Sequence, residues 1–283
     1  TMVQLFNRRQ LLVGAGALAL AGIAHAGTPR RETFQVTEHE LPLPGLDPAH
    51  DGVRVAHLTD LHIGLSTPDG RITAAVRAIN EARPDLVLLT GDFVTASRRP
   101  LTRVGRLLAG LTPPTLAVLG NHDHWVDAAA VRRDLEANGY AVLQNAWTSL
   151  RVRGAPLAVV GIDDGGTGHD DVPQALAGLP AEGGRLVMMH TPPTALKLPA
   201  DAGLACFAGH THGGQLRIPR LTDALVRCAG QPFVKGWYRV AGNPLYVNCG
   251  LGYGLGGPAV RLNAPPEVAF FTLRAAPTAA DRG

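Results

Sequence analysis

Residues Val53–His62 read VRVAHLTDLH, and this stretch sets a pattern that recurs along the chain. Val53 to Leu58 is a short apolar run typical of a buried strand, and Asp60-Leu61-His62 follows where the run ends. Four later apolar runs also end in carboxylate, amide or imidazole side chains. The pattern therefore indicates an α/β protein whose chemistry lies at strand ends.

Strand and helix patterns alternate through the first half of the chain. Helical patterns fall at 72–82, 101–108 and 128–137, and strand patterns at 53–58, 86–89 and 116–119. Such alternation predicts βαβ units and a largely parallel sheet. After Gly139 strand patterns dominate, at 147–152, 157–162, 186–189, 204–208, 245–248 and 268–273. We expect two packed sheets with helices outside, in one domain over residues 53–274.

The charge balance gives no support for a nucleic-acid partner. Lysine and arginine number 26 against 23 acidic residues, and removal of Arg8 and Arg9 with a leader would leave a net charge of +1. Binding a phosphate backbone needs concentrated positive charge. The pair Arg98-Arg99 is interpreted as a solvated loop.

Three cysteines share no CxxC spacing, so they indicate neither a structural zinc site nor a disulfide framework. One pair could still bridge outside the cytoplasm, and at least one thiol must stay free. We expect that thiol to be buried as a small apolar side chain.

The first 26 residues resemble a twin-arginine export signal. Arg8-Arg9 precede the apolar run Leu11 to Ala24, which is shorter than the roughly 20 residues that span a bilayer. Ala24-His25-Ala26 then offers a small-x-small cleavage pattern. We expect the export machinery as a partner and an exported, periplasmic or cell-envelope location; an uncleaved N-terminal membrane anchor is the alternative.

The two ends of the body read differently from its centre. Residues 27–52 are polar and proline-rich, and are interpreted as an entry segment in which Phe34, Val36 and Leu41 hint at an edge strand. Residues 275–283 are small and polar enough to form a flexible tail.

Five strand ends carry polar side chains that can meet at one edge of a sheet. They are Asp60-Leu61-His62, Gly91-Asp92, Gly120-Asn121-His122-Asp123, His190 and Gly209-His210-Thr211-His212. Residues i and i+2 of an extended segment can point the same way, so Asp60 with His62, or His210 with His212, could grip one centre or adjacent centres.

These side chains predict a site for two divalent transition metal ions. Imidazole, carboxylate and amide ligands without thiolate suit Mn, Fe or Zn. The seven ligands exceed the needs of one ion, whereas two ions about 3.5 to 4 Å apart, bridged by a carboxylate, would use them all. Each motif alone is weak evidence for a metal site, and the prediction rests on the occurrence of all of them in this order.

The motif series resembles that of the calcineurin-like metallophosphoesterases. One bacterial subgroup, of exported or membrane-associated phosphodiesterases, has similar longer motifs. In this sequence they read Gly209-His-Thr-His-Gly-Gly-Gln215, Lys235-Gly236, Tyr246-Val-Asn248 and Pro266-Glu267. The resemblance covers about residues 53–273, and every metal-binding position of the family has a matching residue in this chain. It implies a four-layer α/β/β/α sandwich with two mixed β-sheets flanked by helices.

The resemblance also implies a role for each residue. One metal would be held by Asp60, His62, Asp92 and His212, and the other by Asp92, Asn121, His190 and His210. Asp92 would bridge the ions, and a hydroxide shared between them would attack phosphorus. His122 would contact the substrate phosphate and stabilise or protonate the leaving oxygen, and Asp123 would orient His122.

Several assignments stay open from the sequence. His124, which follows the Asn-His-Asp motif, and Tyr253, in the glycine-rich run 250–257, are candidate substrate contacts. The substrate is expected to be a small-molecule or lipid-linked phosphomonoester or phosphodiester, and the protein could associate peripherally with a membrane. The alternative function is a non-catalytic metal-binding scaffold of the same fold, against which the full ligand set and His122 speak.

Other histidines and the tryptophans are interpreted as structural. His57 is expected to be packed or hydrogen-bonded within the first strand. Trp125, Trp147 and Trp237 are expected at the core or rim, because no basic patch accompanies them as a platform for stacked bases would require.

Overall fold

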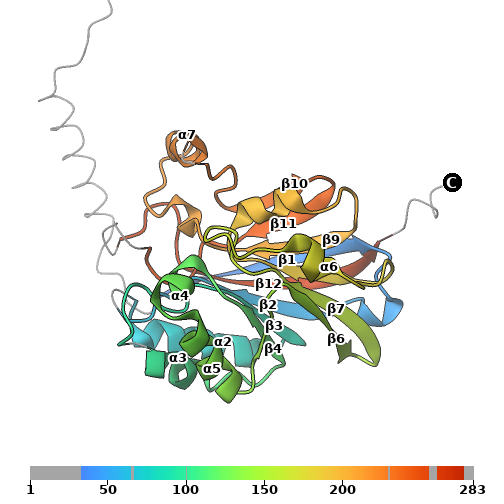
Figure 1. Ribbon diagram of the computed structural model, residues 1–283, viewed down its shortest axis with the longest axis horizontal. Coiled ribbons are helices and arrows are strands. Elements are labelled where there is room, and N and C mark those ends of the chain that lie inside the picture. The colour runs from blue at the N-terminus through green and yellow to red at the C-terminus, as the bar shows by residue number, and fades with distance from the viewer. Residues whose placement is uncertain (1–32, 65–66, 100, 229, 255–259, 277–283) are drawn as a thin grey trace, which may run out of the picture.

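The computed structural model describes residues 33–64, 67–99, 101–228, 230–254 and 260–276, which build two packed six-stranded sheets (Figure 1). In the first sheet the order is β1 (Gln35–Pro44), β12 (Glu267–Ala276), β2 (Arg54–Leu58), β3 (Leu86–Thr90), β4 (Thr115–Val118) and β5 (Ala141–Val142). In the second it is β10 (Gly236–Val240), β11 (Asn243–Val247), β9 (Leu204–Ala208), β8 (Arg185–Met188), β7 (Ala155–Gly161) and β6 (Ala146–Val152).

Both sheets are mixed. Strands β2, β3, β4 and β5 run parallel, while β12 is antiparallel to β2. In the second sheet β7, β8, β9 and β11 run parallel, with β6 and β10 antiparallel at the two edges. The parallel strands therefore end on the same side of each sheet, which is where the polar clusters follow them.

Side-chain alternation in the strands builds the layers. Leu86 and Leu88 of β3 face the core between the sheets, whereas Val87 and Leu89 face the outer helices. The helices α2 (Asp69–Ala82), α3 (Leu101–Leu108) and α5 (Ala128–Ala137) cover the first sheet. The second sheet is covered by α6 (Val172–Leu176) and the 3-10 helix η2 (Pro192–Lys197). The predicted four-layer α/β/β/α sandwich is confirmed.

Helix α2 shows how the sequence produces this packing. Its buried positions Ile72, Ala75, Val76 and Ile79 recur at the spacing of one helical face, and they pack on the first sheet. The helix ends at Ala82, and the next residue, Arg83, has left-handed backbone with a φ of 49° and donates its N–H to the carbonyl oxygens of Ile79 and Asn80.

The strands and helices expected from the sequence are present with small shifts of their ends. The edge strand hinted at within 27–52 is confirmed: residues 35–44 form β1, which lies at the edge of the first sheet and pairs with β12 along its whole length, so this sheet begins before residue 53. Likewise β12 continues to Ala276, past the expected domain end at 274. The predicted leader 1–26 and the tail residues 277–283 lie outside the described residues.

Several described elements were not expected from the sequence. They are α6 and η2, α4 (Asn121–Val126), α7 (Leu221–Cys228), η1 (Pro48–His50), η3 (His212–Gly214) and the strands β5 and β10. All three cysteines are free: Cys206 and Cys249 are buried, and Cys228 is exposed. Among the described residues, the helices are all too short or too polar to cross a bilayer.

Candidate metal centre

The backbone of the strand-end loops is unusual at the predicted ligands. Asp60, His62, Asp92, His210 and His212 have φ values of 53°, 47°, 54°, 70° and 50°. Left-handed backbone is uncommon for residues with a side chain, and it persists where surrounding contacts enforce it. Here the Asp60 N–H donates to Gly91 O and the His62 N–H to Asp92 O, both at 3.0 Å. The loops after β2 and β3 therefore fix each other.

Two glycines are required by close approach. A Cβ at Gly120 would lie 2.2 Å from Asp92 Oδ1, and a Cβ at Gly209 would lie 2.3 Å from Asp60 Oδ2. The carboxylates thus occupy the space that a side chain would need, which explains why glycine precedes Asn121 and His210.

Asp60, His62 and His212 form the first cluster of ligand atoms. His62 Nε2 lies 2.9 Å from His212 Nε2, and His212 Nε2 lies 3.3 Å from Asp60 Oδ1. All three side chains are buried, and His62 Nδ1 has no hydrogen-bond partner among the described residues.

Asp92, Asn121, His190 and His210 form the second cluster. His190 Nε2 lies 3.2 Å from Asp92 Oδ2 and 3.1 Å from Asn121 Oδ1. His210 Nδ1 lies 2.9 Å from the same Asn121 oxygen. His190 Nδ1 donates to the carbonyl oxygen of Thr90 at 2.7 Å, which fixes the ring and directs Nε2 into the cluster.

Asp92 joins the two clusters. Its Oδ2 lies 3.5 Å from His62 Nε2 and 3.2 Å from His190 Nε2. Ligands held about 2.1 Å from one ion lie roughly 3 to 3.5 Å from one another, so these separations fit two cation sites that share Asp92.

Burial sets the protonation of the imidazoles. It lowers the pKa of His62 to about 3 and that of His210 to about 4, and lowers the pKa of His212 well below its ordinary value. These rings are therefore neutral at pH 7, which is the form that binds metal. Burial also lowers the pKa of His190, but the Asp92 carboxylate outweighs it and raises that pKa to about 10.

His122 lies beside the clusters and is held by a carbonyl. Its Nδ1 donates to Thr95 O, its ring centroid is 4.8 Å from that of His62, and its N–H donates to Asp92 Oδ1 at 2.9 Å. It also lies near enough to His62 and Asp92 to complete a third group of ligand atoms. The exposed Trp125 packs edge-on against it as a rim aromatic.

The role expected for Asp123 is wrong. Asp123 Oδ1 accepts from the N–H groups of Phe93 and Val94 at 2.9 and 3.1 Å, and Oδ2 accepts from the Gly120 N–H at 2.9 Å. Both oxygens are thus used in holding the loops after β3 and β4 together. The carbonyl of Thr95, rather than Asp123, orients His122.

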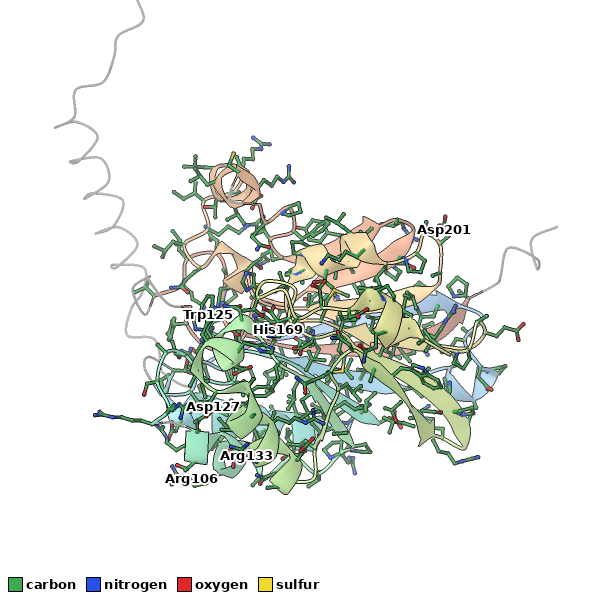
Figure 2. All side chains as sticks on the ribbon, in the orientation of Figure 1. Arg106, Trp125, Asp127, Arg133, His169 and Asp201 are labelled. Carbon is green, nitrogen blue, oxygen red and sulfur yellow. The ribbon has the colours of Figure 1, made fainter. Side chains whose placement is uncertain are left out.

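His124 and Tyr253 both have partners within the protein. His124 Nε2 lies 2.8 Å from Asp163 Oδ1, and its ring stacks at 4.0 Å on His169, which Figure 2 labels. The Tyr253 hydroxyl accepts from the buried Arg71 at 3.0 Å. Their expected contact with substrate stays a prediction.

Sequence reasoning missed Asp163 and Arg261. Asp163 follows β7, so the strand-end rule that found the other clusters could also have found it. Arg261 Nη2 lies 2.9 Å from His212 Nδ1, and Arg261 Nη1 donates to Cys249 O at 2.6 Å. No motif marks this arginine, because it reaches the site through chain folding alone.

A groove opens next to His122. It has a volume of about 510 Å³, lies between the loops after β2 and β3, and is lined by Ile63, Gly64, Thr95, Ala96, Ser97, Arg99 and Arg103. Thr95 both lines the groove and orients His122, so a molecule in the groove would lie beside the metal clusters.

Comparisons with known proteins show which family the chain belongs to. Residues 53–214 match the family model of calcineurin-like phosphoesterases. The chain is 30% identical to the uncharacterised metallophosphoesterase YkuE of Bacillus subtilis, covering 95% of this chain and 98% of YkuE. It is 31% identical to the phosphodiesterase YaeI of Escherichia coli, covering 78% and 82%. It is 25% identical to the UDP-2,3-diacylglucosamine pyrophosphatase LpxG of Chlamydia trachomatis, covering 77% and 82%.

The family match spans more than half of the chain, and the relatives cover most of the rest. The resemblance read from the motifs is therefore confirmed. Members of this family use divalent metal ions, and the clusters around Asp92 could bind them. The chain belongs to the calcineurin-like phosphoesterases and is a phosphoric ester hydrolase.

Proposed function

We propose that the protein is a two-metal phosphodiesterase of the cell envelope, and that Mn, Fe or Zn fills its sites. The observation that carries the proposal is the position of the buried Asp92 carboxylate between two clusters of ligand atoms, in which burial keeps His62, His210 and His212 neutral at pH 7. Asp60, His62, Asp92 and His212 would hold one ion, and Asp92, Asn121, His190 and His210 the other. Ions bound there would supply an activated water and offset negative charge on the phosphoryl oxygens.

The protein's own residues would position the ester. His122 is held with Nδ1 as a donor to Thr95 O, and its Nε2, which has no hydrogen bond to a described residue, would contact the phosphate or stabilise the leaving oxygen. Arg99 and Arg103 line the groove beside His122; Arg103 is paired with Asp69, so Arg99 is the one that would favour an anionic part of the substrate. Asp123 would act indirectly, by holding the two loops that carry Asp92 and Asn121.

A diester or pyrophosphate linkage is favoured over a monoester. The relative YaeI is a phosphodiesterase, and the relative LpxG is a UDP-2,3-diacylglucosamine pyrophosphatase. The groove beside His122 offers room for a second substituent on phosphorus. The export-like leader supports a cell-envelope location and a lipid-linked substrate.

The test combines metal analysis with hydrolysis of an aryl phosphodiester. We expect about two transition metal ions per chain and activity that a chelator abolishes. Asp92→Asn should lower kcat/KM by about 100-fold or more, because the shared ligand loses its charge. A chain that hydrolyses the ester equally well without metal would contradict the mechanism.

Asp201→Asn provides a matched control for this experiment. Asp201 has nearly the same left-handed backbone as Asp92, with φ values of 51° and 54°, but it is exposed and lies on the other side of the molecule from Trp125, which packs against His122 (Figure 2). Its replacement should leave hydrolysis unchanged. Equal losses in the two variants would show that the site is elsewhere.

A further inference from the structure

Helix α7 is unlike the other described helices, because none of its side chains is buried. It stands clear of both sheets in Figure 1, carried on the segments that precede and follow it. A helix of eight residues gains little stability on its own, so a contact outside the described structure would account for its amphipathic pattern.

Exposed apolar side chains gather on α7 and the strand-like segments at its base. Of the ten large apolar side chains that are exposed among the described residues, six lie here: Leu216, Ile218, Leu221, Leu225, Val260 and Leu262. Leu221 and Leu225 lie one turn apart on the same face of α7, and they are 53% and 62% exposed. Leu216 and Leu262 are joined by a β-bridge. The six residues are called the α7 surface below.

The same region is basic. Residues 215–235 contain four basic residues and one acidic residue, a net charge of +3 that equals the net charge of the whole chain. The one acidic side chain, Asp223, is already paired with Arg217 at 3.1 Å. Arg220 and Arg227 are exposed. An apolar helix face flanked by arginines is the pattern of a helix that lies in the interface of an anionic bilayer.

The α7 surface is connected directly to the metal clusters. Gln231, which follows α7, lies with Nε2 3.3 Å from His210 Nε2, and the Thr211 hydroxyl donates to Val234 O at 2.6 Å. Arg261, between Val260 and Leu262, contacts His212. A membrane bound by the α7 surface would therefore lie next to the site that acts on phosphate esters.

We propose that the α7 surface docks on an anionic phospholipid bilayer and presents the metal site to phosphate esters of membrane lipids. The substrate class rests on the proposed function, whereas the docking does not. A second copy of the chain fits this surface less well, because a symmetric contact would bring Arg220 and Arg227 against their own counterparts.

Cys228 at the end of α7 offers a direct test. It is exposed, whereas Cys206 and Cys249 are buried, and burial raises the pKa of the Cys249 thiol to about 12. A polarity-sensitive maleimide dye should therefore label Cys228 in the full-length chain. We expect its emission to shift to the blue with vesicles of phosphatidylglycerol and phosphatidylcholine, and not with phosphatidylcholine alone. Absence of a shift would overturn the proposal.

Matched variants separate the apolar and the charged contributions. Leu221→Ser with Leu225→Ser should weaken the vesicle-induced shift by about tenfold or more, whereas Leu196→Ser, on a leucine that is 60% exposed elsewhere, should not. Arg220→Asn with Arg227→Gln should weaken it by about fivefold per arginine at low salt. Asparagine suits position 220, where φ is 68°. Arg106→Gln with Arg133→Gln, at the opposite end of the molecule in Figure 2, is the control.

Sedimentation and hydrolysis of a soluble ester distinguish the membrane contact from the alternatives. If the leucine variant keeps the full shift, the membrane contact arises elsewhere and the proposal is wrong. If it instead converts a dimer to a monomer in sedimentation, a second copy covers the surface and the proposal is also wrong. Hydrolysis of a water-soluble aryl phosphodiester should be unchanged in the leucine variant. If the wild-type protein does not hydrolyse this ester, the proposed function is wrong, but the docking result is unaffected.

Discussion

Asp60, Asp92 and His212 combine burial with left-handed backbone, two features that a single residue rarely shows for structural reasons alone. Each left-handed residue with a side chain costs about 1 to 2 kcal/mol. The cost is offset by reciprocal contacts, since the His210 N–H donates to Asp60 Oδ2 at 3.0 Å and the His122 N–H donates to Asp92 Oδ1 at 2.9 Å. At the residue scale, the site is thus a set of strained positions that fix one another.

His57 allows a prediction about acid stability. It is fully buried in β2, its Nε2 lies 2.8 Å from the Thr90 hydroxyl, and burial lowers its pKa from 6.5 to about 3. The structural role expected from the sequence is confirmed. Below pH 6.5 the unfolded chain takes up this proton while the folded chain does not, so stability falls as the pH drops toward 3.

The variant His57→Gln removes this titration. Between about pH 7 and about pH 5, the wild type should lose about 2 kcal/mol more of its free energy of unfolding than the variant does. Urea unfolding at the two pH values measures the difference. Equal losses would mean that His57 accepts a proton within the folded protein.

At the scale of elements, one buried carboxylate explains several of the sequence motifs. Glu267 at the start of β12 accepts from the Thr37 hydroxyl at 2.7 Å, from the Tyr246 hydroxyl at 2.5 Å and from the Cys249 N–H at 2.9 Å. It therefore ties β1 to β11 and fixes the loop that begins at Cys249. A Cβ at Gly250 in that loop would lie 2.5 Å from Asp60 Cβ, so the loop packs directly on a predicted ligand.

The sequence predicted the elements whose signals are local. Apolar runs identified β2, β3, β4, β8 and β9, and polar residues directly after them identified the clusters. Functions set by distant contacts were not predictable. Asp123 lies beside His122 in the sequence, yet it bonds amides 29 and 30 positions away. Arg71 and Tyr253 meet across 182 positions, and β5, with two residues, is too short for any periodicity to appear.

Gly120 tests the contact between the loops after β3 and β4. Gly120→Ala would place a Cβ 2.2 Å from Asp92 Oδ1, and the carboxylate would have to move. We expect kcat/KM to fall about 100-fold, because a displacement of about 1 Å at a metal ligand is enough for such a loss. Gly110→Ala is the control, since its Cβ would meet only the tip of Val76 at 3.2 Å. Equal activity in the two variants would show that Asp92 need not keep this position.

At the scale of the whole molecule, the two sheets contribute different ligands. The first sheet supplies Asp60, His62, Asp92 and Asn121, and the second supplies His190, His210 and His212. Neither sheet alone provides either cluster, because His212 completes the first and His190 with His210 completes the second. A metal bound in either cluster would link the sheets at their shared edge.

Metal should therefore stabilise the packing of one sheet on the other. A metal ion whose free concentration is 100 times its Kd increases the free energy of unfolding by about 2.7 kcal/mol. This raises the Tm of a domain of this size by roughly 5 to 10 °C. Thermal unfolding with added manganese and with a chelator measures this difference. Asp92→Asn should lose most of the shift, because both clusters share Asp92, whereas the exposed Asp201→Asn should keep it. A chelator that leaves the wild-type Tm unchanged would show that metal does not join the two sheets.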